Sequence, residues 1–328
     1  MRAPRFWYRR PGLLSALLSP LGALYAAGTA QRLAKGGRKR LDVPVICVGN
    51  INAGGTGKTP TAIALMERLR DTGIAPHAVT RGHGGSLEGP VRVDERRHRA
   101  SEVGDEALLL AAFAPTWVAK DRVAGALAAV KAGAEVIVLD DGFQNPSLAH
   151  DLSIVVVDAA HGFGNGRVLP AGPLREPMST GLARADFVLS VGSETAQDGF
   201  EAQYGKEIGC PHLRGHLEPL QTGLPMEGMP VVAFAGIGHP EKFFATLRGM
   251  GADLRAVHPL TDHQPLSDTL MTRMLREASA LGAQVVTTEK DAVRLSPALR
   301  PKVMTVPVRL RLDDWSALDA ALDRLFQA

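Results

Sequence analysis

The sequence predicts an α/β protein with a parallel-sheet domain, a smaller second α/β domain and an amphipathic helical segment at the N-terminus. Short runs of β-branched residues alternate with helical stretches from residue 43 onward, which is the pattern of strand–helix–strand units. A second strand–loop–helix unit begins at Val231. The first 40 residues lack this alternation and carry leucines at helical spacing. These three observations predict the fold class.

The composition is that of a globular protein long enough for two domains. The chain has 328 residues, of which 45% are hydrophobic and 22% charged, and its formal net charge is +3. The net charge is therefore too small to indicate what kind of partner the protein binds. The two cysteines, Cys47 and Cys210, do not indicate a disulfide framework, so a reducing compartment is expected.

Residues 1–40 combine positive charge with an apolar run. They hold nine Arg and Lys residues and no Asp or Glu, a composition that suits an anionic surface. Leucines at 13, 14, 17, 18, 21 and 24 follow helical spacing, with Arg, Trp and Tyr on the flank. We expect a membrane-associating pair of helices in the headgroup region. The alternatives are a signal peptide, a membrane span that contains Pro20, and an amphipathic helix packed on the core.

The elements of the first domain follow from its apolar runs. A strand over 43–48 leads through a glycine-rich loop into a helix over 59–70. Residues 135–139 contain the run VIVL, which is apolar on both faces, as a central parallel strand is. The other expected strands are 75–80, 116–119, 154–157 and 187–190, and the other expected helices are 105–114 and 122–132.

The chain changes character between residues 193 and 229, where Gly and Pro interrupt any long apolar period. We interpret 210–217 as an extended connector. Beyond it, strands are expected from 231, over 254–257 and over 284–287, with a helix over 267–281. The expected borders are 1–40 for the N-terminal segment, 41–205 for the first domain, 206–230 for the connector and 231–328 for the second domain.

The glycine-rich loop has the composition of a phosphate-binding loop. It reads Asn52-Ala53-Gly54-Gly55-Thr56-Gly57-Lys58-Thr59, close to the Walker A pattern G-x-x-x-x-G-K-[ST]. Its backbone N–H groups would face phosphate oxygens, Lys58 would reach the β and γ phosphates, and the Thr59 hydroxyl would reach Mg²⁺. Asn52 replaces the first glycine, and asparagine tolerates a left-handed backbone. The loop predicts a P-loop NTPase-like domain that uses a nucleoside triphosphate.

Two carboxylates, Asp140 and Asp141, follow the expected central strand at its carboxyl end, where ligands bind in open α/β sheets. An aspartate there is the Walker B arrangement, which holds Mg²⁺ directly or through water. Adjacent carboxylates repel each other unless a cation lies beside them. We therefore expect a metal site, with a loop-capping pair as the alternative.

Three further polar pairs are ambiguous from the residues alone. Asp105-Glu106 begins a helix, where acidic residues serve equally well as caps or as catalysts. Asp262-His263 lies in the second domain, and a lone histidine is more often structural or solvated. Arg175-Glu176 lies in the loop AGPLREP, where a phosphate or a transition state would attract the arginine.

Taken together, the motifs resemble those of the tetraacyldisaccharide 4′-kinase family, the lipid A 4′-kinases of Gram-negative bacteria. The resemblance runs in family order from residue 48 to 295 and is far more specific than the phosphate loop alone. The matching stretches are VGNINAGGTGKTP (48–60), TRGHGG (80–85), VGDEALLL (103–110), LDDGFQN (139–145), LPAGPLREP (169–177), FAGIGHPEKFF (234–244), TDHQP (261–265) and TTEKDAVRL (287–295). Asn at position 52 is itself typical of this family.

The resemblance implies a reaction. ATP would donate its γ-phosphoryl group to the 4′-hydroxyl of a tetraacylated glucosamine disaccharide 1-phosphate, giving lipid IVA. Asp105 would be the catalytic base, paired with His263, and Lys58 and Arg175 would be further catalytic residues. Thr261 and Gln264 stand where the family often has Pro and a second His, which is a departure beside His263.

The resemblance also implies where the cofactors bind. ATP would lie on residues 52–59, and Glu106 would be a further active-site residue. Mg²⁺ would be held by Thr59, Asp140, Asp141 and Glu176. Because His263 lies beyond the connector, we expect the two domains to close over the substrate and exclude water.

The implied substrate decides the expected partners. A lipid with four acyl chains stays in the bilayer, so we expect the enzyme to act at the membrane surface, on the cytoplasmic face of the bacterial inner membrane. Nucleic acid is not expected, because the basic N-terminus carries no recognition motif. No obligate protein partner is predicted.

Two other function classes fit parts of the sequence. A P-loop ATPase of the membrane-partitioning or metal-delivery type has a related loop, usually with Lys at the position of Ala53. A nucleotide-gated membrane adaptor without catalysis would not need Asp105, Asp140 and Asp141. Phosphate transfer to a lipid rather than release into water separates these alternatives from a kinase.

Overall fold

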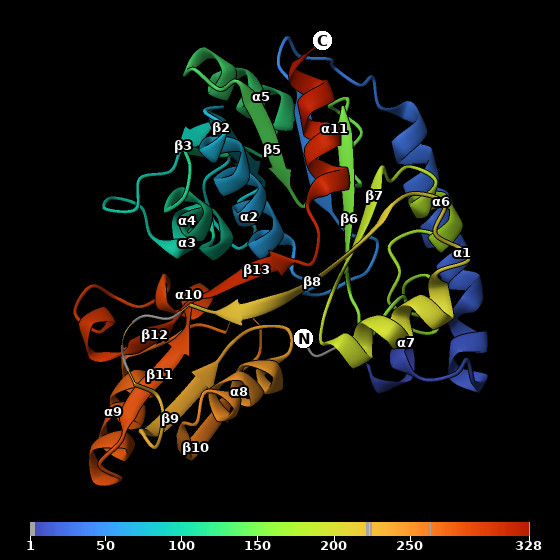
Figure 1. The fold of residues 1–328 in the computed structure, drawn as a ribbon. Helices are drawn as coiled ribbons and strands as arrows, with labels where there is room; N and C mark the ends of the chain where they lie inside the picture. The colour runs from blue at the N-terminus through green and yellow to red at the C-terminus, as the bar shows by residue number, and fades with distance from the viewer. Residues whose placement is uncertain (1–3, 221–222, 224, 263, 328) are drawn as a thin grey trace.

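The computed structural model describes residues 4–220, 223, 225–262 and 264–327 (Figure 1). Two sheets form two domains that lie one above the other. The larger has nine strands in the order β13-β8-β7-β6-β1-β5-β2-β4-β3, and the smaller has four in the order β10-β9-β11-β12. The predicted fold class, a parallel α/β sheet with a second α/β unit and an N-terminal apolar helix, is confirmed.

The strands and helices predicted for the larger domain from apolar runs are present, and the structure adds others that were not predicted, among them β3, β8, β13 and α7. Its strands are β1 (Val45–Gly49), β2 (Pro76–Thr80), β3 (Val91–Arg92), β4 (Thr116–Val118), β5 (Val136–Asp140), β6 (Leu152–Asp158), β7 (Phe187–Val191), β8 (His212–Pro219) and β13 (Val308–Leu312). Its helices are η1 (Arg5–Tyr8), α1 (Leu13–Lys35), α2 (Lys58–Asp71), α3 (Ala100–Val103), α4 (Asp105–Ala111), α5 (Arg122–Lys131), α6 (Met178–Leu182), α7 (Glu194–Tyr204) and α11 (Ser316–Phe326).

The central strand β1 is buried on both faces because helices cover both sides of the larger sheet. Side chains alternate along a strand, so Ile46 and Val48 pack with α2, α4 and α11, while Val45 and Cys47 pack with α5, α6 and α7. β1 pairs in parallel with β5 on one side and β6 on the other. The carboxyl ends of these three strands therefore meet at one edge.

The smaller sheet is a three-layer unit of its own. Its strands are β9 (Pro230–Ala235), β10 (Asp253–Pro259), β11 (Gln284–Thr288) and β12 (Met304–Val306), all paired in parallel. Helix α8 (Pro240–Gly249) covers one face and α9 (Asp268–Ala280) covers the other. The short helices α10 (Glu289–Ala292) and η2 (Arg300–Lys302) complete it.

The segment expected as a connector contributes a strand to the larger sheet. β8 pairs in parallel with β7, and β13 returns from the smaller sheet to pair antiparallel with β8. Helix α11 then packs on the larger domain through Leu318 and Leu322. Only Leu213 in β8 is a buried large apolar side chain, so this strand lacked the apolar run that marked the others. The borders 1–40, 41–205, 206–230 and 231–328 stay a proposal, and the strand pairing places 212–219 and 308–326 with the larger sheet.

The N-terminal segment contains the short 3-10 helix η1 and one long α-helix, so the leucine-rich run is a single helix and not the expected pair. α1 is continuous from Leu13 to Lys35 and passes through Pro20. A proline inside a helix removes one backbone hydrogen bond and bends the helix, but it does not require the helix to end. The helix therefore continues along one edge of the larger domain (Figure 1).

Helix α1 buries small residues and exposes leucines, which is the reverse of an ordinary surface helix. Small residues spaced by seven, Ser15, Gly22 and Thr29, face the body of the protein, and Gly22 lies against Val168 and Ala171. The leucines point away from the body, and Leu13, Leu17 and Leu24 are 92%, 75% and 70% exposed. An amphipathic helix that buries its leucines in the core is therefore excluded. Among the described residues, α1 is also the helix whose length and hydropathy would allow it to cross a membrane.

The docking of α1 predicts opposite effects for two glycines on the same helix. A Cβ at Gly22 would lie 2.9 Å from the carbonyl oxygen of Val168, whereas a Cβ at Gly28 would meet no described heavy atom within 4 Å. We expect Gly28→Ala to stabilise the protein by about 0.5–1 kcal/mol through helix propensity. Gly22→Ala should lose this gain and loosen α1. Both effects are measured by thermal unfolding in detergent and by the rate at which a protease cleaves the chain just after α1, beyond residue 35. Equal stabilisation by both variants would contradict this packing.

Candidate active site

The phosphate loop connects the end of β1 to the start of α2. Gly57 caps α2 with a φ of 100° and Gly54 has a φ of 118°, both in the left-handed region that favours glycine. Inside the curl, the buried Asn50 donates to the carbonyl oxygen of Gly54 at 3.3 Å and to the hydroxyl of Thr56 at 3.2 Å. The loop is thus supported by a side chain beneath it, and its amides beyond Ala53 can face a phosphate.

Asn52 has a different role from the one its sequence position suggested. Within the described chain, Asp141 is the one residue other than glycine with a positive φ. The backbone of Asn52 is therefore not in the left-handed region. Its buried side-chain amide instead donates to the carbonyl oxygen of Gly162 at 3.0 Å. The next residue, Ala53, donates its backbone N–H to Pro173 at 2.7 Å. Asparagine at this position therefore ties the phosphate loop to the segment that ends in Arg175 and Glu176.

Asp140, the last residue of β5, and Asp141, the next residue, face the two residues that begin α2. The Thr59 hydroxyl donates to Asp140 Oδ2 at 3.2 Å, and Lys58 Nζ lies 3.7 Å from Asp141 Oδ1. Arg175 Nη1 donates to the same Asp141 oxygen at 3.0 Å. Asp140 Oδ1 is buried and has no hydrogen-bond partner within the described part of the chain. A buried carboxylate oxygen beside a threonine hydroxyl fits a hard cation such as Mg²⁺.

The two carboxylates have shifted pKa values of opposite sign. Burial and the nearby Glu106 carboxylate raise the pKa of Asp140 to about 7, although Lys58 opposes the shift. Burial also acts against ionisation of Asp141, but Lys58 and Arg175 outweigh it and lower the pKa of Asp141. Asp141 is therefore the charged partner of the two cations, while Asp140 favours its charged form only when a further cation approaches.

Glu176 is not placed as a metal ligand by its contacts. It is 1% exposed, and both of its carboxylate oxygens accept from Arg184 Nη2 at 2.6 Å. Gln144 Nε2 also donates to Glu176 at 2.9 Å, while Gln144 Oε1 accepts from Arg175 at 3.2 Å. This chain of contacts favours a role in orienting Arg175, because Glu176 already accepts from both Arg184 and Gln144, and its expected role as a metal ligand stays a prediction.

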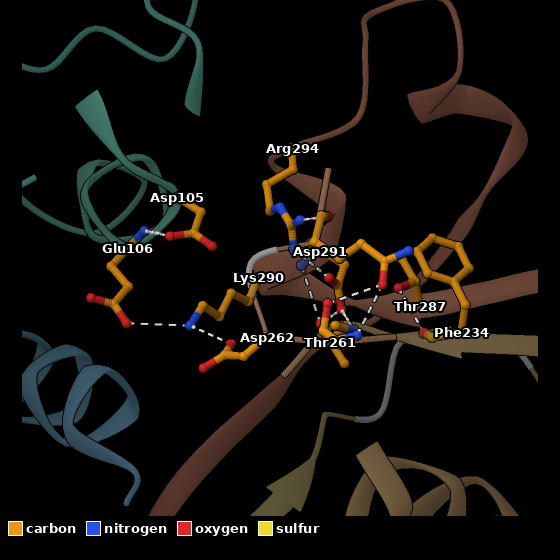
Figure 2. A network of polar contacts seen from close by, with 12 residues as sticks. Asp105, Glu106, Phe234, Thr261, Asp262, Thr287, Lys290, Asp291 and Arg294 are labelled. Atoms are coloured by element: carbon orange, nitrogen blue, oxygen red, sulfur yellow. Dashed lines mark hydrogen bonds and ion pairs between the residues drawn. The ribbon is translucent and has the colours of Figure 1, made fainter. Parts of the chain in front are cut away.

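The candidate base lies at the start of α4. Asp105 is 4% exposed, and its Oδ1 accepts from the backbone N–H of Glu106 at 3.0 Å. Figure 2 shows Asp105 and Glu106 facing Asp262 and Lys290 of the smaller domain. Lys290 Nζ lies 3.3 Å from Glu106 and 3.5 Å from Asp262. His263, the expected partner of Asp105, lies outside the described residues, and its neighbour Asp262 reaches the same site.

A cleft of about 1040 Å³ runs between the two domains. Its walls include Gly55 to Pro60 of the phosphate loop and α2, Glu106, and Asp262 and Lys290 of the smaller domain. A second pair of cross-domain contacts closes another side, where Lys242 Nζ lies 2.6 Å from Asp158 and the rings of His239 and His161 stack 4.4 Å apart. The cleft thus joins the phosphate loop to residues of both domains, as a site for two substrates requires.

The comparison with known proteins agrees with this geometry. A family model described as Tetraacyldisaccharide-1-P 4'-kinase matches residues 14–327. The chain belongs to this family.

Close relatives that carry this family's name match the chain over nearly the whole length of both proteins. The Tetraacyldisaccharide 4'-kinase of Jannaschia sp. (strain CCS1) is 69% identical over 325 residues, covering 99% of both chains. That of Dinoroseobacter shibae is 64% identical and covers 99% of this chain and 98% of its own. The crystal structure of LpxK from Aquifex aeolicus in complex with ATP superposes with a TM-score of 0.76 at 27% identity, over 96% of this chain and 100% of that one. The family assignment sets aside the membrane-partitioning ATPase and the adaptor without catalysis.

The sequence predicted the charged residues at the carboxyl ends of the strands, but not the side chains that hold those residues in place. Asn50, Gln144, Arg184 and Lys290 had been given no role. Asn50, Gln144 and Lys290 lie in stretches that match the family, so the resemblance could have marked them as candidates, whereas Arg184 lies beyond the stretch 169–177. The contacts of Asn50 and the pairing of Arg184 with Glu176 are local, but Gln144 reaches Arg175 across 31 residues and Lys290 reaches Glu106 across 184.

The opposite pKa shifts predict opposite effects of two matched substitutions. Because the folded-state pKa of Asp140 is raised from 3.8 to about 7, the folded protein binds more protons than the unfolded chain between these values. Stability of the metal-free protein should therefore fall as pH rises through this range. Asp140→Asn should raise the Tm at pH 8 by a few degrees, with a gain of about 1.4 kcal/mol for each unit of pKa shift removed.

Asp141→Asn is the control of opposite sign. The folded-state pKa of Asp141 is lowered, so its charge stabilises the protein above the unfolded pKa, and this contribution is lost as the pH falls through the lower folded value. Asparagine tolerates the φ of 56° at this position. The variant should lower the Tm at pH 8. A stability scan from pH 4 to 8 without metal in which both variants shift the Tm in the same direction would refute the electrostatic description.

Proposed function

We propose that this protein is an ATP-dependent kinase that phosphorylates the 4′-hydroxyl of tetraacyldisaccharide 1-phosphate to form lipid IVA in lipid A biosynthesis. The observation that carries the proposal is the meeting of Lys58 and Thr59 with Asp140 and Asp141 at the mouth of a cleft that Glu106 also lines. That arrangement binds a triphosphate on one wall and leaves room for an acceptor on the other. The full-length match to relatives named as this kinase supports the choice of acceptor.

The nucleotide would lie along residues 52–59, with its phosphates against the loop amides and Lys58. Thr59 and Asp140 are the residues that best fit Mg²⁺, since they offer a hydroxyl and an unpaired buried carboxylate oxygen, and Asp141 can join them. When bound, Mg²⁺ would neutralise charge on the β and γ phosphates. Glu176 would support this site from behind through Gln144 and Arg184.

Asp105 is the proposed general base. A sugar hydroxyl has a pKa far above 7, so its proton must leave as the oxygen attacks. The acceptor O–H proton passes to the Asp105 carboxylate, the new bond forms between the 4′-oxygen and the γ-phosphorus, and the bond from that phosphorus to the β-phosphate oxygen breaks to release ADP. His263 would orient this base. Arg175, held 3.0 Å from Asp141, would stabilise negative charge that develops on the transferred group.

The position of the leucines on α1 supports action at a membrane. Their exposed row offers an apolar surface, and the Arg and Lys residues of the N-terminal segment would face anionic headgroups. A lipid acceptor with four acyl chains remains in that bilayer, so the kinase would bind there and draw only the sugar headgroup into the cleft. Because ATP is a cytosolic substrate, we propose the cytoplasmic face of the inner membrane.

The reaction predicts that a single carboxylate controls phosphate transfer. Purified protein is incubated with labelled ATP, Mg²⁺ and the disaccharide lipid acceptor, and the label in lipid is measured. Asp105→Asn should lower kcat by about 10²–10⁴-fold, the usual contribution of a general base. Asp42→Asn, an exposed aspartate of the same domain, is the control and should keep full activity. Label that appears only as inorganic phosphate would instead indicate an ATPase.

The exposed face of α1 predicts membrane binding that depends on its leucines. A variant with Leu17, Leu21 and Leu24 all changed to Ser keeps the small residues that dock the helix, so the fold should remain. Burial of one leucine contributes about 1.5–3 kcal/mol, so binding to anionic vesicles should weaken by at least about tenfold. The control is Leu127→Ser, which removes an exposed leucine from α5. Unchanged co-sedimentation of the triple variant with vesicles would contradict the proposal.

A further inference from the structure

Lys290 is a partly buried lysine of the smaller domain that reaches toward the larger one. It lies on α10, and its side chain points across the cleft to the start of α4 (Figure 2). Its Nζ lies 3.3 Å from Glu106 Oε1 of the larger domain and 3.5 Å from Asp262 Oδ1 of its own domain. One ammonium group therefore joins the two acidic segments between which the acceptor hydroxyl would react.

The charge of Lys290 is secured by its surroundings. Burial alone would lower the pKa of this lysine, but the carboxylates of Glu106, Asp105 and Asp262 outweigh burial and raise it. The side chain is therefore an ammonium ion throughout the neutral range. Three carboxylates gathered at one place would repel one another without it. Loss of the ammonium would separate the two domains at the point where they must meet.

Both neighbours of Lys290 in the chain fix the short helix that carries it. Glu289 Oε2 accepts from Arg309 Nη1 at 2.8 Å and from the backbone N–H of Val308, which ties α10 to β13 of the larger sheet. Asp291 is fully buried and accepts from the backbone N–H of Gly236 at 2.9 Å, which ties α10 to the end of β9. The position of Lys290 is thus set from two directions.

The same helix also holds the turn that contains Asp262. Asp291 accepts from Arg294 Nη1 at 2.9 Å, and Arg294 Nη2 donates to the carbonyl oxygen of Gln264. Gln264 in turn accepts from the backbone N–H of Thr261 at 3.1 Å. Thr261 and Gln264 are therefore anchored through Arg294 to the helix that presents Lys290.

We propose that Lys290 is a positioning residue for phosphoryl transfer, which holds the turn around Asp262 against the start of α4 so that both domains contribute to one reaction site. The inference rests on the proposed kinase function. Lys58 follows the phosphate loop and lies 3.7 Å from Asp141, whereas Lys290 lies beside the carboxylates of Glu106 and Asp262. Lys290 therefore acts on the geometry around Asp105 and not on the affinity for ATP.

The test compares three variants of the full chain. Lys290→Met removes the charge and keeps the length, Lys290→Arg keeps the charge, and Lys302→Met changes an exposed lysine of the same domain. For Lys290→Met we expect kcat for lipid phosphorylation to fall about 10²-fold, the scale of a misplacement of about 1 Å, while the KM for ATP stays close to wild type. Lys290→Arg should recover part of kcat, and Lys302→Met should match wild type.

Two further measurements separate positioning from a general loss of structure. The acidic limb of the kcat profile should move to higher pH in Lys290→Met, because carboxylates that lose a neighbouring cation bind protons more readily. Hydrogen exchange at the backbone amides of Thr261 and Asp262 should speed up in this variant without any lipid present, while the amides of β1 and β9 keep their protection.

Several results would overturn the inference. A raised KM for ATP with unchanged kcat would make Lys290 a nucleotide ligand, and wild-type kcat in Lys290→Met would leave it no role. Arg and Met variants with equal kcat would show that the charge is not what matters. The proposed function fails separately, if the wild-type protein phosphorylates no lipid, and the hydrogen-exchange comparison would still report on the link between the domains.

Discussion

The structure depends on one electrostatic constraint, which is that two adjacent carboxylates, the buried Asp140 and the partly buried Asp141, lie at the end of β5. Such a pair is unstable without cations beside it. Lys58 and Arg175 neutralise Asp141, and Thr59 contacts Asp140, whose second oxygen faces no donor among the described residues. The protein therefore keeps a place for a further cation next to its phosphate loop. Two contacts hold these charged side chains in place. Asn52 ties the curled loop to Gly162, and Gln144 supports Arg175.

A second consequence is that the reaction site is divided between two domains. The chain leaves the larger sheet after β8, forms the smaller sheet and returns through β13, so two neighbouring strands carry the smaller domain. Contacts on two sides of the cleft, Lys290 with Glu106 and Lys242 with Asp158, hold the domains together. At a distance from the cleft, α1 docks through small residues and leaves its leucines exposed. The cleft between the domains and the exposed leucines of α1 thus lie in different parts of the protein.

Much of this architecture was predictable because it follows from local patterns. A strand buried on both faces must be a continuous apolar run, and a loop that curls around phosphate needs glycine, so β1, β5 and the phosphate loop were recognised from the residues. Lys58, Thr59, Asp140 and Asp141 were found for the same reason, since a P-loop and the end of a neighbouring parallel strand meet at one edge. The family resemblance added Asp105 and Arg175, which local patterns left ambiguous between capping and catalysis.

The sequence by itself determined the apolar inner strands of the larger sheet, the phosphate loop and the identity of the charged groups, because each of these is encoded within a few consecutive residues. Only the tertiary structure decided how those groups are used. It showed that Asn52 is a tether and not a left-handed turn residue, that Glu176 is paired with Arg184, and that the segment around Leu213 is a strand of the larger sheet. It also brought Lys290 to Glu106, 184 residues away in the chain. Such pairings depend on long-range packing and on which lone pairs remain unoccupied, and no local pattern carries that information.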